Sequence, residues 1–338
     1  MTKILVTGGA GFIGGNFVQY MLKKYSEYEI YNLDMLTYAG DLTKHQEIEQ
    51  YKNYSFINMD IADRTSIEAL FEEEEFDYVV HFAAESHVDR SIDDPAIFIR
   101  TNVLGTQVLL DAAKQINVKK FVHVSTDEVY GELEFDSDTF FDENSPIQPN
   151  SPYSASKASS DLLVRAYNET YGLPVNITRC SNNYGPYHFP EKLIPLTISR
   201  VLNDQEVPVY GNGNNIRDWL HVTDHCSAID LIMHEAKSGE VFNIGGHNEK
   251  SNLEVVRTII RSLGKSEDLI KFVTDRKGHD KRYAIDPTKL EQLGWKPVYD
   301  FESGIAHTVQ WFLDNKDWWE NILSGEYQSY FKKQYTLK

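Results

Sequence analysis

The sequence predicts an α/β fold, in which helices cover both faces of a doubly wound parallel sheet and a smaller, mixed α/β domain follows. Two observations predict this. In the first half of the chain, short apolar runs alternate with longer segments whose apolar residues recur every three or four positions, as in repeated βαβ units. After Arg179 this rhythm stops, and Asn, Gly and Pro divide the chain into shorter elements.

The expected elements follow from these periodicities. Strands are expected at 3–7, 29–33, 54–59, 77–82, 120–125 and 174–178, and helices at 12–24, 64–74, 95–115, 152–171 and 302–315. A chain of 338 residues is longer than one ordinary domain. We expect a large domain from residues 1–178 with a return segment at about 216–245, and a small one from 179–215 and 246–338.

Composition excludes several classes of protein. Lys and Arg number 33 against 51 Asp and Glu, and a net charge of −18 disfavours binding to a nucleic-acid backbone. No apolar run approaches the roughly 18 residues that a membrane span requires. The two cysteines, Cys180 and Cys226, stand in no metal-ligand spacing and suggest a reducing compartment. We therefore expect a cytoplasmic protein.

A glycine-rich turn follows the first expected strand. Gly8, Gly11 and Gly14 form a G-x-x-G-x-x-G pattern that opens a helix, where backbone N–H groups can receive a pyrophosphate. Asp34 stands just past the next strand, where a carboxylate accepts ribose hydroxyls and repels a 2′-phosphate. The pattern therefore predicts a site for NAD rather than NADP, with Asp60 and Ile61 near the adenine. A turn that serves chain packing alone is the alternative.

A phenol and an ammonium share one face of the helix expected at 152–171. Tyr153 and Lys157 are four residues apart, so their side chains point to the same spot. A nearby lysine cation stabilises a phenolate and lets a tyrosine accept a hydroxyl proton near neutral pH. With the glycine-rich turn and Ser125-Thr126 at a strand end, this pair resembles the extended short-chain dehydrogenase/reductase family over nearly the whole chain.

Three stretches narrow this resemblance to the NAD-dependent sugar-nucleotide dehydratases of that family, which act on dTDP-glucose. They are AAESHVDRS at 83–91, STDEVYG at 125–131 and DRKGHD at 275–280. The resemblance implies oxidation of the sugar at C4 through Tyr153, loss of water across C5 and C6, and return of hydride to C6. Glu128 takes the C5 proton and a protonated Asp127 supplies the proton to the departing hydroxyl. Since NAD is regenerated in every turnover, we expect it to be tightly retained.

The resemblance also implies the remaining site residues. Thr126 hydrogen-bonds the C4 oxygen, and Lys157 fixes the nicotinamide ribose. Around NAD it adds Phe12, Ile13, Met35, Leu36, Thr37, Phe82, Ala83, Ala84, Glu85, Ser86, Thr101 and Asn183 to the residues above. Around the nucleotide sugar it places Ser86, Thr126, Asn182, Lys192, Leu193, Pro208, Val209, Tyr210, Arg217, Asn252, Asp275, Arg276, Lys277, Gly278 and His279. Arg217 and the cations that follow Asp275 suit a pyrophosphate in a chain that is otherwise acidic.

Four further expectations concern ligands and partners. His81, Glu85 and His87 span a strand end and a loop, so we expect no metal site. The aromatic residues near the end of the chain, Trp318, Trp319, Tyr327 and Tyr330, are expected to pack on the body and not to form a cofactor site. Family members pair through two long helices, so 95–115 and 152–171 predict a homodimer with a four-helix bundle. Dehydration of UDP- or CDP-glucose and a non-catalytic NAD-dependent sensor are the alternative functions.

Overall fold

A seven-stranded parallel sheet organises the larger part of the chain. The computed structural model describes residues 1–43, 48–275 and 278–323. The sheet has the order β10-β6-β5-β4-β1-β2-β3, and every neighbouring pair is parallel. Its strands are β1 (Thr2–Thr7), β2 (Tyr28–Asp34), β3 (Tyr54–Asn58), β4 (Tyr78–His81), β5 (Lys120–Thr126), β6 (Val175–Cys180) and β10 (Val241–Ile244). The predicted doubly wound parallel sheet is confirmed, and β10 extends it beyond the strands expected from the first half of the chain.

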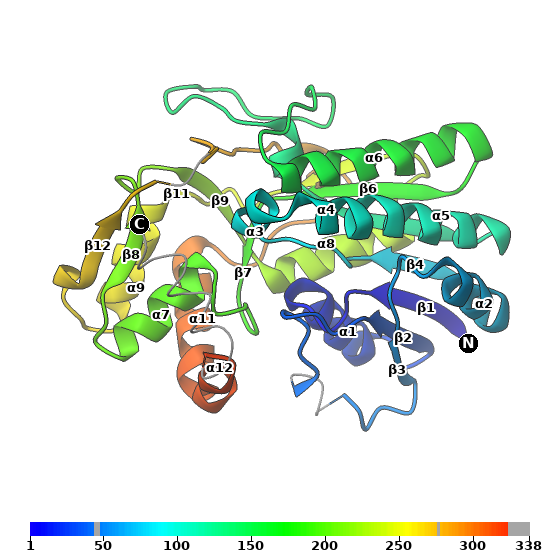
Figure 1. The fold of residues 1–338 in the computed structure, drawn as a ribbon, viewed down its shortest axis with the longest axis horizontal. Coiled ribbons are helices and arrows are strands. Elements are labelled where there is room, and N and C mark those ends of the chain that lie inside the picture. The colour runs from blue at the N-terminus through cyan, green and yellow to red at the C-terminus, as the bar shows by residue number, and fades with distance from the viewer. Residues whose placement is uncertain (44–47, 276–277, 324–338) are drawn as a thin grey trace.

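Helices cover both faces of this sheet (Figure 1). On one face α1 (Phe12–Lys24) packs against α8 (Val222–Glu235), over a core that includes Ile4, Val6 and Phe17. On the other face lie α2 (Arg64–Glu74), α5 (Thr106–Gln115) and α6 (Pro152–Tyr171). The helices expected at 12–24, 64–74 and 152–171 are therefore confirmed with the same bounds.

A single regular helix was expected at 95–115, and this expectation was wrong. The segment consists of α4 (Pro95–Phe98), a π-helical segment η2 (Ile99–Gly105) and α5. Asn102 of η2 is buried, and its amide pairs with the backbone of Glu85, accepting from the N–H at 2.8 Å and donating to the C=O at 3.0 Å. The wider π turn thus accompanies a long-range contact, which apolar periodicity cannot reveal.

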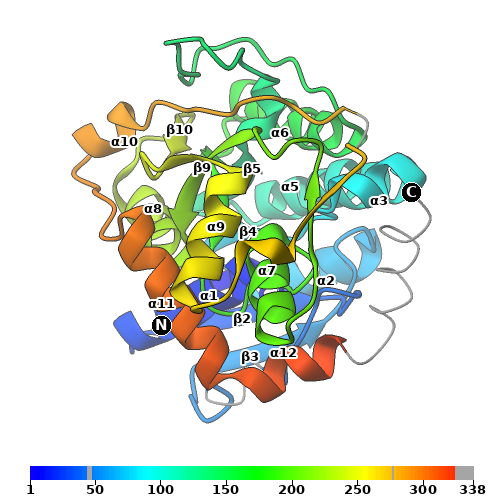
Figure 2. The same ribbon diagram turned by 90° about the vertical axis from the view of Figure 1, so that its left-hand side faces the viewer.

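The second part of the molecule lies to the left in Figure 1 and faces the viewer in Figure 2. It contains the three-stranded sheet β11-β9-β7 and the pair β12-β8. These strands are β7 (Asn182–Tyr184), β8 (Val207–Tyr210), β9 (Ile216–His221), β11 (Glu249–Ser251) and β12 (Ile270–Val273). Its longer helices are α7 (Leu193–Leu202), α9 (Asn252–Ser262), α11 (Phe301–Asp314) and α12 (Lys316–Leu323). Short helices complete the chain: α3 (Val88–Asp93), η3 (Asp127–Tyr130), η4 (Glu267–Leu269) and α10 (Thr288–Gln292).

The segment 216–245 contributes to both parts. Its strand β9 belongs to the three-stranded sheet, whereas α8 packs on α1 and β10 pairs with β6 in the large sheet. The chain therefore leaves the large sheet after β6, forms β7 to β9, and returns with α8 and β10. None of the helices in the described ranges is long and apolar enough to cross a bilayer.

Candidate active site

A cavity of ≈ 380 Å³ lies where the carboxyl ends of the parallel strands meet the second part of the chain. Sites at this edge are typical of doubly wound sheets, because loops from several strands converge there. The cavity brings together all five predicted catalytic residues, and of the residues predicted around NAD it includes all except Leu36. Leu36 is 38% exposed, and its backbone N–H donates to Asp34 Oδ1 at 2.8 Å.

The glycine-rich turn has the close backbone approach that its sequence predicts. Gly8 has φ +74°, and a Cβ at this position would lie 2.6 Å from the backbone nitrogen of Ala83. A Cβ on Gly14 would collide with the carbonyl oxygen of Gly8. Gly11 caps α1 with an extended backbone and no side chain over the first N–H groups. The turn is therefore open to an anionic group at the start of α1.

Asp34 stands at the end of β2, beside this turn. Its carboxylate accepts hydrogen bonds from the N–H of Ala10 at 3.0 Å and of Leu36 at 2.8 Å, which fix its orientation. A carboxylate oxygen can accept more than one hydrogen bond, so a carboxylate at this position suits hydroxyl donors. Asp60, past β3, pairs with Arg100 at 2.5 Å and also lines the cavity. A glycine turn that leaves room for phosphate, followed by a held carboxylate, fits a dinucleotide without a 2′-phosphate.

Tyr153 and Lys157 lie on the buried face of α6. The helix begins with a capping box, in which Ser151 and Ser154 bond each other's backbone N–H groups. Lys157 Nζ donates to the carbonyl oxygen of Val124 in β5 at 2.8 Å. Burial lowers the pKa of Lys157 to about 8, and burial together with Glu128 raises the pKa of Tyr153 well above its usual value. A phenolate at Tyr153 therefore depends on a cation close by.

The carboxyl pair follows directly from the end of β5. Thr126 Oγ1 caps η3, accepting from the N–H of Glu128 at 3.3 Å, and donates to Asp127 Oδ1 at 3.3 Å. Asp127 is 2% exposed, and its Oδ2 has no hydrogen-bond partner among the described residues. Burial, followed by the neighbouring Glu128, raises the pKa of Asp127 well above its ordinary value. Burial therefore favours the protonated form of Asp127, which is the form that the role of an acid requires.

The residues predicted around the nucleotide sugar fall into two groups. Ser86, Thr126, Asn182, Lys192 and Leu193 line the cavity. The others that the structure describes do not line it: Pro208, Val209, Tyr210, Arg217, Asn252, Asp275, Gly278 and His279. Arg276 and Lys277 lie outside the described residues.

Members of this second group have close partners of their own. The Arg217 guanidinium lies 4.2 Å from the centre of the Tyr283 ring, and Arg217 lowers the pKa of Asp127, against the larger effect of burial. The rings of Tyr210 and His279 are 6.0 Å apart, and His279 Nδ1 lies 2.6 Å from Asp275 Oδ1. Of these side chains, Arg217 acts electrostatically on an acid that lines the cavity.

Several residues of the cavity could not be predicted from the sequence. His188 stacks on Phe12 with ring centroids 4.4 Å apart, and Glu191 accepts a hydrogen bond from Tyr38 at 3.2 Å. Trp318 packs against the core around Phe312 and Trp319, as expected, and it also lines the cavity, with its indole N–H donating to Asp41 at 2.7 Å. His188 and Glu191 come from one stretch of the chain and Trp318 from another. The position of Glu191 directly before Lys192 is the one signal that could have indicated any of them.

The remaining expectations from the sequence concern metals and the end of the chain. No group of three or more His, Cys, Asp or Glu side chains in the described ranges could hold a metal ion. His81 bonds Thr7 at 2.7 Å and Thr106 at 2.9 Å. Trp319 is fully buried on the body as expected, whereas Tyr327 and Tyr330 lie outside the described residues.

The parallel sheet, the glycine-rich turn and the Tyr153–Lys157 pair together define an extended short-chain dehydrogenase/reductase. Comparison with known proteins narrows the class. A family model described as GDP-mannose 4,6 dehydratase matches residues 5–308. The chain is 51% identical to the dTDP-glucose 4,6-dehydratase of Neisseria meningitidis serogroup B, over 97% of this chain and 98% of that protein.

Solved structures give the same result. The dTDP-glucose 4,6-dehydratase of Bacillus anthracis, in complex with NAD, has a TM-score of 0.89 at 50% identity, covering 95% of this chain and 100% of the other. That of Streptomyces venezuelae, also with NAD bound, has a TM-score of 0.91 at 46% identity, with the same coverage. The chain belongs to the dTDP-glucose 4,6-dehydratase family.

Proposed function

We propose that the protein is a hydro-lyase that converts dTDP-glucose to dTDP-4-keto-6-deoxyglucose and water, with NAD as a retained cofactor. One observation carries the assignment: Asp127, whose pKa is raised by burial, stands next to the partly exposed Glu128 in the same cavity as Tyr153 and the glycine-rich turn. An adjacent acid and base are what an elimination requires. A simple oxidation or epimerisation has no use for this pair.

The cavity fits NAD at one end. Gly8, Gly11 and Gly14 leave room for the pyrophosphate at the start of α1, and Asp34 is held where it can accept ribose hydroxyls. The predicted catalytic pair, Tyr153 and Lys157, lines the same cavity. When bound, NAD supplies a hydride acceptor that is reduced at sugar C4 and reoxidised at C6, so that no external redox partner is consumed.

The side chains of this protein then divide the proton transfers. Tyr153, as a phenolate beside Lys157, accepts the proton of the C4 hydroxyl, and Thr126 donates a hydrogen bond to the C4 oxygen. A carbonyl at C4 makes the C5 proton acidic, because the carbanion is delocalised onto oxygen. Glu128 removes that proton, and Asp127 delivers its own to the departing C6 hydroxyl, which leaves as water. Glu128 then returns its proton to C5 as hydride reaches C6.

We assign the nucleotide end of the substrate to Arg217 and to the cluster of Tyr210, Asp275 and His279. His279 contacts the other two members of this cluster, and an arginine fork suits the pyrophosphate oxygens. On this proposal residues 1–178 with 216–245 hold NAD, and residues 179–215 with the chain from 246 onward hold the sugar nucleotide.

Incubation with dTDP-, UDP- and CDP-glucose tests the substrate assignment. The alkali-labile 4-keto product is expected to form fastest from dTDP-glucose, and a protein without NAD-dependent turnover would yield none from any donor. A preference for UDP- or CDP-glucose would overturn the nucleobase assignment while leaving the dehydratase chemistry intact.

We propose further that the protein is a cytoplasmic homodimer. Exposed apolar side chains lie along the two segments predicted to pair: Ile99 at 52% and Leu104 at 46% in η2, and Leu162 at 53% and Tyr171 at 56% in α6. Both cysteines are buried free thiols, which suits a reducing compartment.

A charge in the middle of this surface tests the dimer. Leu162→Glu is expected to give a monomer by light scattering, because a carboxylate in an apolar interface is desolvated without a partner. Leu313→Glu on α11, where the leucine is 43% exposed, is the matched control and is expected to leave the assembly unchanged. A Leu162→Glu protein with the same mass as the wild type would contradict the four-helix arrangement.

A further inference from the structure

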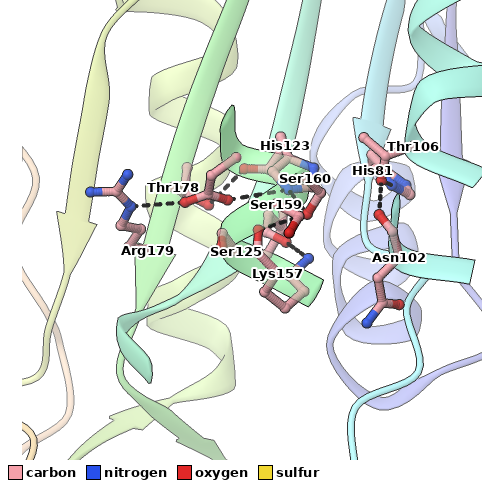
Figure 3. A network of polar contacts seen from close by, with 12 residues as sticks. His81, Asn102, Thr106, His123, Ser125, Lys157, Ser159, Ser160, Thr178 and Arg179 are labelled. Carbon is pink, nitrogen blue, oxygen red and sulfur yellow. Dashed lines mark hydrogen bonds and ion pairs between the residues drawn. The ribbon is translucent and has the colours of Figure 1, made fainter. Parts of the chain in front are cut away.

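A chain of buried charged side chains lies behind Tyr153 and Lys157, beyond the residues that line the cavity. Asp161 on α6 is 1% exposed, and its Oδ2 accepts from Arg179 Nε of β6 at 2.9 Å. Its Oδ1 lies 3.4 Å from His123 Nε2 of β5. His123 and Arg179 stand on the neighbouring strands β5 and β6, and Figure 3 shows both in one polar network with Lys157. Burying a carboxylate is unfavourable without such partners, and the assigned reaction gives Asp161 no substrate to contact.

Asp161 follows Lys157 by one helical turn, so the two side chains share the buried face of α6. Burial lowers the pKa of Lys157, and Asp161 is the group that most strongly opposes this effect. Burial raises the pKa of Asp161 in turn, but His123 and Arg179 outweigh burial and lower it. Asp161 is therefore an anion next to a lysine that burial alone would tend to neutralise.

The other titratable groups around Lys157 supply no charge to it. They are His81 from β4, His123 from β5 and Cys180 from β6. The Thr106 hydroxyl donates to the Asn102 carbonyl, so it accepts from His81 Nε2, and the Thr7 hydroxyl donates to Nδ1 of the neutral ring. Burial lowers the pKa of His81 and lowers that of His123 to about 4, and it raises the pKa of Cys180 to about 12.

The remaining charges near this face have partners of their own. Arg179 Nη1 donates to the Tyr130 hydroxyl at 2.9 Å, and Arg179 Nε is taken up by Asp161. On the helices packed against α6, Asn102 bonds Ser156 at 2.8 Å, and Asp111 bonds Tyr167 farther along the helix at 2.7 Å. Asp161 is thus the carboxylate that acts on Lys157 in the described part of the chain.

We infer that Asp161, held by Arg179 and His123, is a positioning residue of the active site, which keeps Lys157 charged from one helical turn away on the same buried face of α6. Lys157 in turn keeps Tyr153 able to accept the proton of the sugar hydroxyl. This role rests on the proposed function, but it concerns a side chain that contacts neither substrate nor cofactor.

Asp161→Asn removes the charge and keeps the shape. Lys157 then loses its proton at lower pH. The alkaline limb of the pH profile of kcat is therefore expected to shift to lower pH by about one unit. At pH values above this limb, kcat is expected to be about tenfold lower than in the wild type. KM for dTDP-glucose is expected to stay within about twofold, because Asp161 lies outside the binding surface. If the substitution only disturbed the packing of the site, kcat would fall at every pH and the two limbs of its pH profile would stay at the same pH.

A second measurement does not depend on turnover. The phenolate absorbance of the NAD-loaded protein is titrated in the Asp161→Asn and wild-type backgrounds, each corrected with the matching Tyr153→Phe variant. The Tyr153 transition is expected at higher pH in Asp161→Asn, because the phenolate then faces a neutral lysine. A wild type that forms no product from dTDP-glucose refutes the proposed function, whereas this titration still reports on the link from Asp161 to Tyr153.

Two variants control for folding. The double variant Asp161→Asn/Arg179→Met leaves no uncompensated arginine and is expected to show the same shift of limb and transition. Asp230→Asn removes another buried carboxylate, which pairs with Lys24 at 2.6 Å far from Tyr153, and is expected to lower stability without moving the profile. If Asp161→Asn keeps the wild-type limbs and the wild-type phenolate transition, the inference is wrong.

Discussion

Asp127 and Glu128 are neighbours in sequence with different surroundings. Asp127 is almost fully buried at the end of β5, where burial holds its proton, while Glu128 is partly exposed and also lines the cavity. One helical turn of η3 therefore presents a proton donor and a proton acceptor to the same small ligand. This difference in environment allows one D-E dipeptide to serve both halves of an elimination.

Glu128→Gln separates oxidation from water loss. The amide cannot accept the C5 proton, so dehydration is expected to slow by at least about 100-fold, the usual contribution of a general base. Reduction of the cofactor on mixing with dTDP-glucose is expected to remain, and stopped-flow absorbance of NADH reports it. Full turnover in this variant would remove Glu128 from the base role.

Asp127→Asn is expected to depend on the leaving group. An amide cannot protonate the departing hydroxyl, so turnover of dTDP-glucose falls by about 100-fold or more, whereas a 6-fluoro analogue needs little proton donation and loses far less. Rates of product formation with both substrates measure this contrast. Equal losses with the two substrates would count against Asp127 as the acid.

At the scale of elements, the glycine-rich turn and α6 could be predicted because each signal is local. The turn is recognised from spacing, and the helix from its apolar period and its Ser151 cap. The π segment within 95–115 could not be predicted, since it coincides with contacts of Asn102 to Glu85 and Ser156. Residues far apart in sequence form those contacts, and no periodicity encodes them.

Gly8→Ala tests the turn. Alanine is strained at φ +74°, and its Cβ would lie 2.6 Å from the Ala83 nitrogen, so we expect a loss of stability of roughly 2 kcal/mol and protein that no longer retains NAD. Gly264→Ala is the matched control, with φ +65° and no atom within 4 Å of the added carbon. Thermal melts and the NAD content of the purified protein distinguish strain alone from the close approach. Retained NAD in Gly8→Ala would contradict the assigned pyrophosphate site.

At the scale of the whole molecule, a polar cluster joins the returning chain to its beginning. Asp230 of α8 accepts from Lys24 at 2.6 Å and from the Tyr25 hydroxyl at 3.1 Å, and His234 Nδ1 lies 3.0 Å from its Oδ1. Asp230 is buried and Lys24 is half exposed. The cluster fixes α8 on α1 after the chain has formed part of the smaller sheet, so it holds the large sheet and its return segment together.

Asp230→Asn is expected to lower the free energy of unfolding in a pH-dependent way. Bonds to Asp230 raise the pKa of His234 above its ordinary 6.5. The stabilisation of the fold by this contact is therefore fully present below pH 6.5 and is lost as pH rises through the raised pKa. Burial raises the pKa of Asp230, but His234 and Lys24 outweigh it and lower the pKa below 3.8, so this contribution is full above 3.8. The penalty, roughly 2 kcal/mol for a buried charged acceptor, is therefore largest between these values.

Denaturant unfolding at mildly acidic and mildly alkaline pH measures this difference between Asp230→Asn and the wild type. A smaller penalty is expected on the alkaline side, where His234 is neutral and Lys24 remains as the charged partner. A penalty that grows with pH would show that the His234 contact does not stabilise the fold.

The sequence by itself determined the doubly wound sheet, the glycine-rich turn with Asp34, and the Tyr153–Lys157 pair, because each depends on periodicity or on spacing within one or two elements. The tertiary structure decided which distant residues share the cavity, including His188, Glu191 and Trp318, and how differently the two neighbouring acids are buried. It also paired Asp161, one helical turn after Lys157, with Arg179 of β6. The physical reason is that burial sets protonation, and burial is a property of the packed molecule that no local pattern contains.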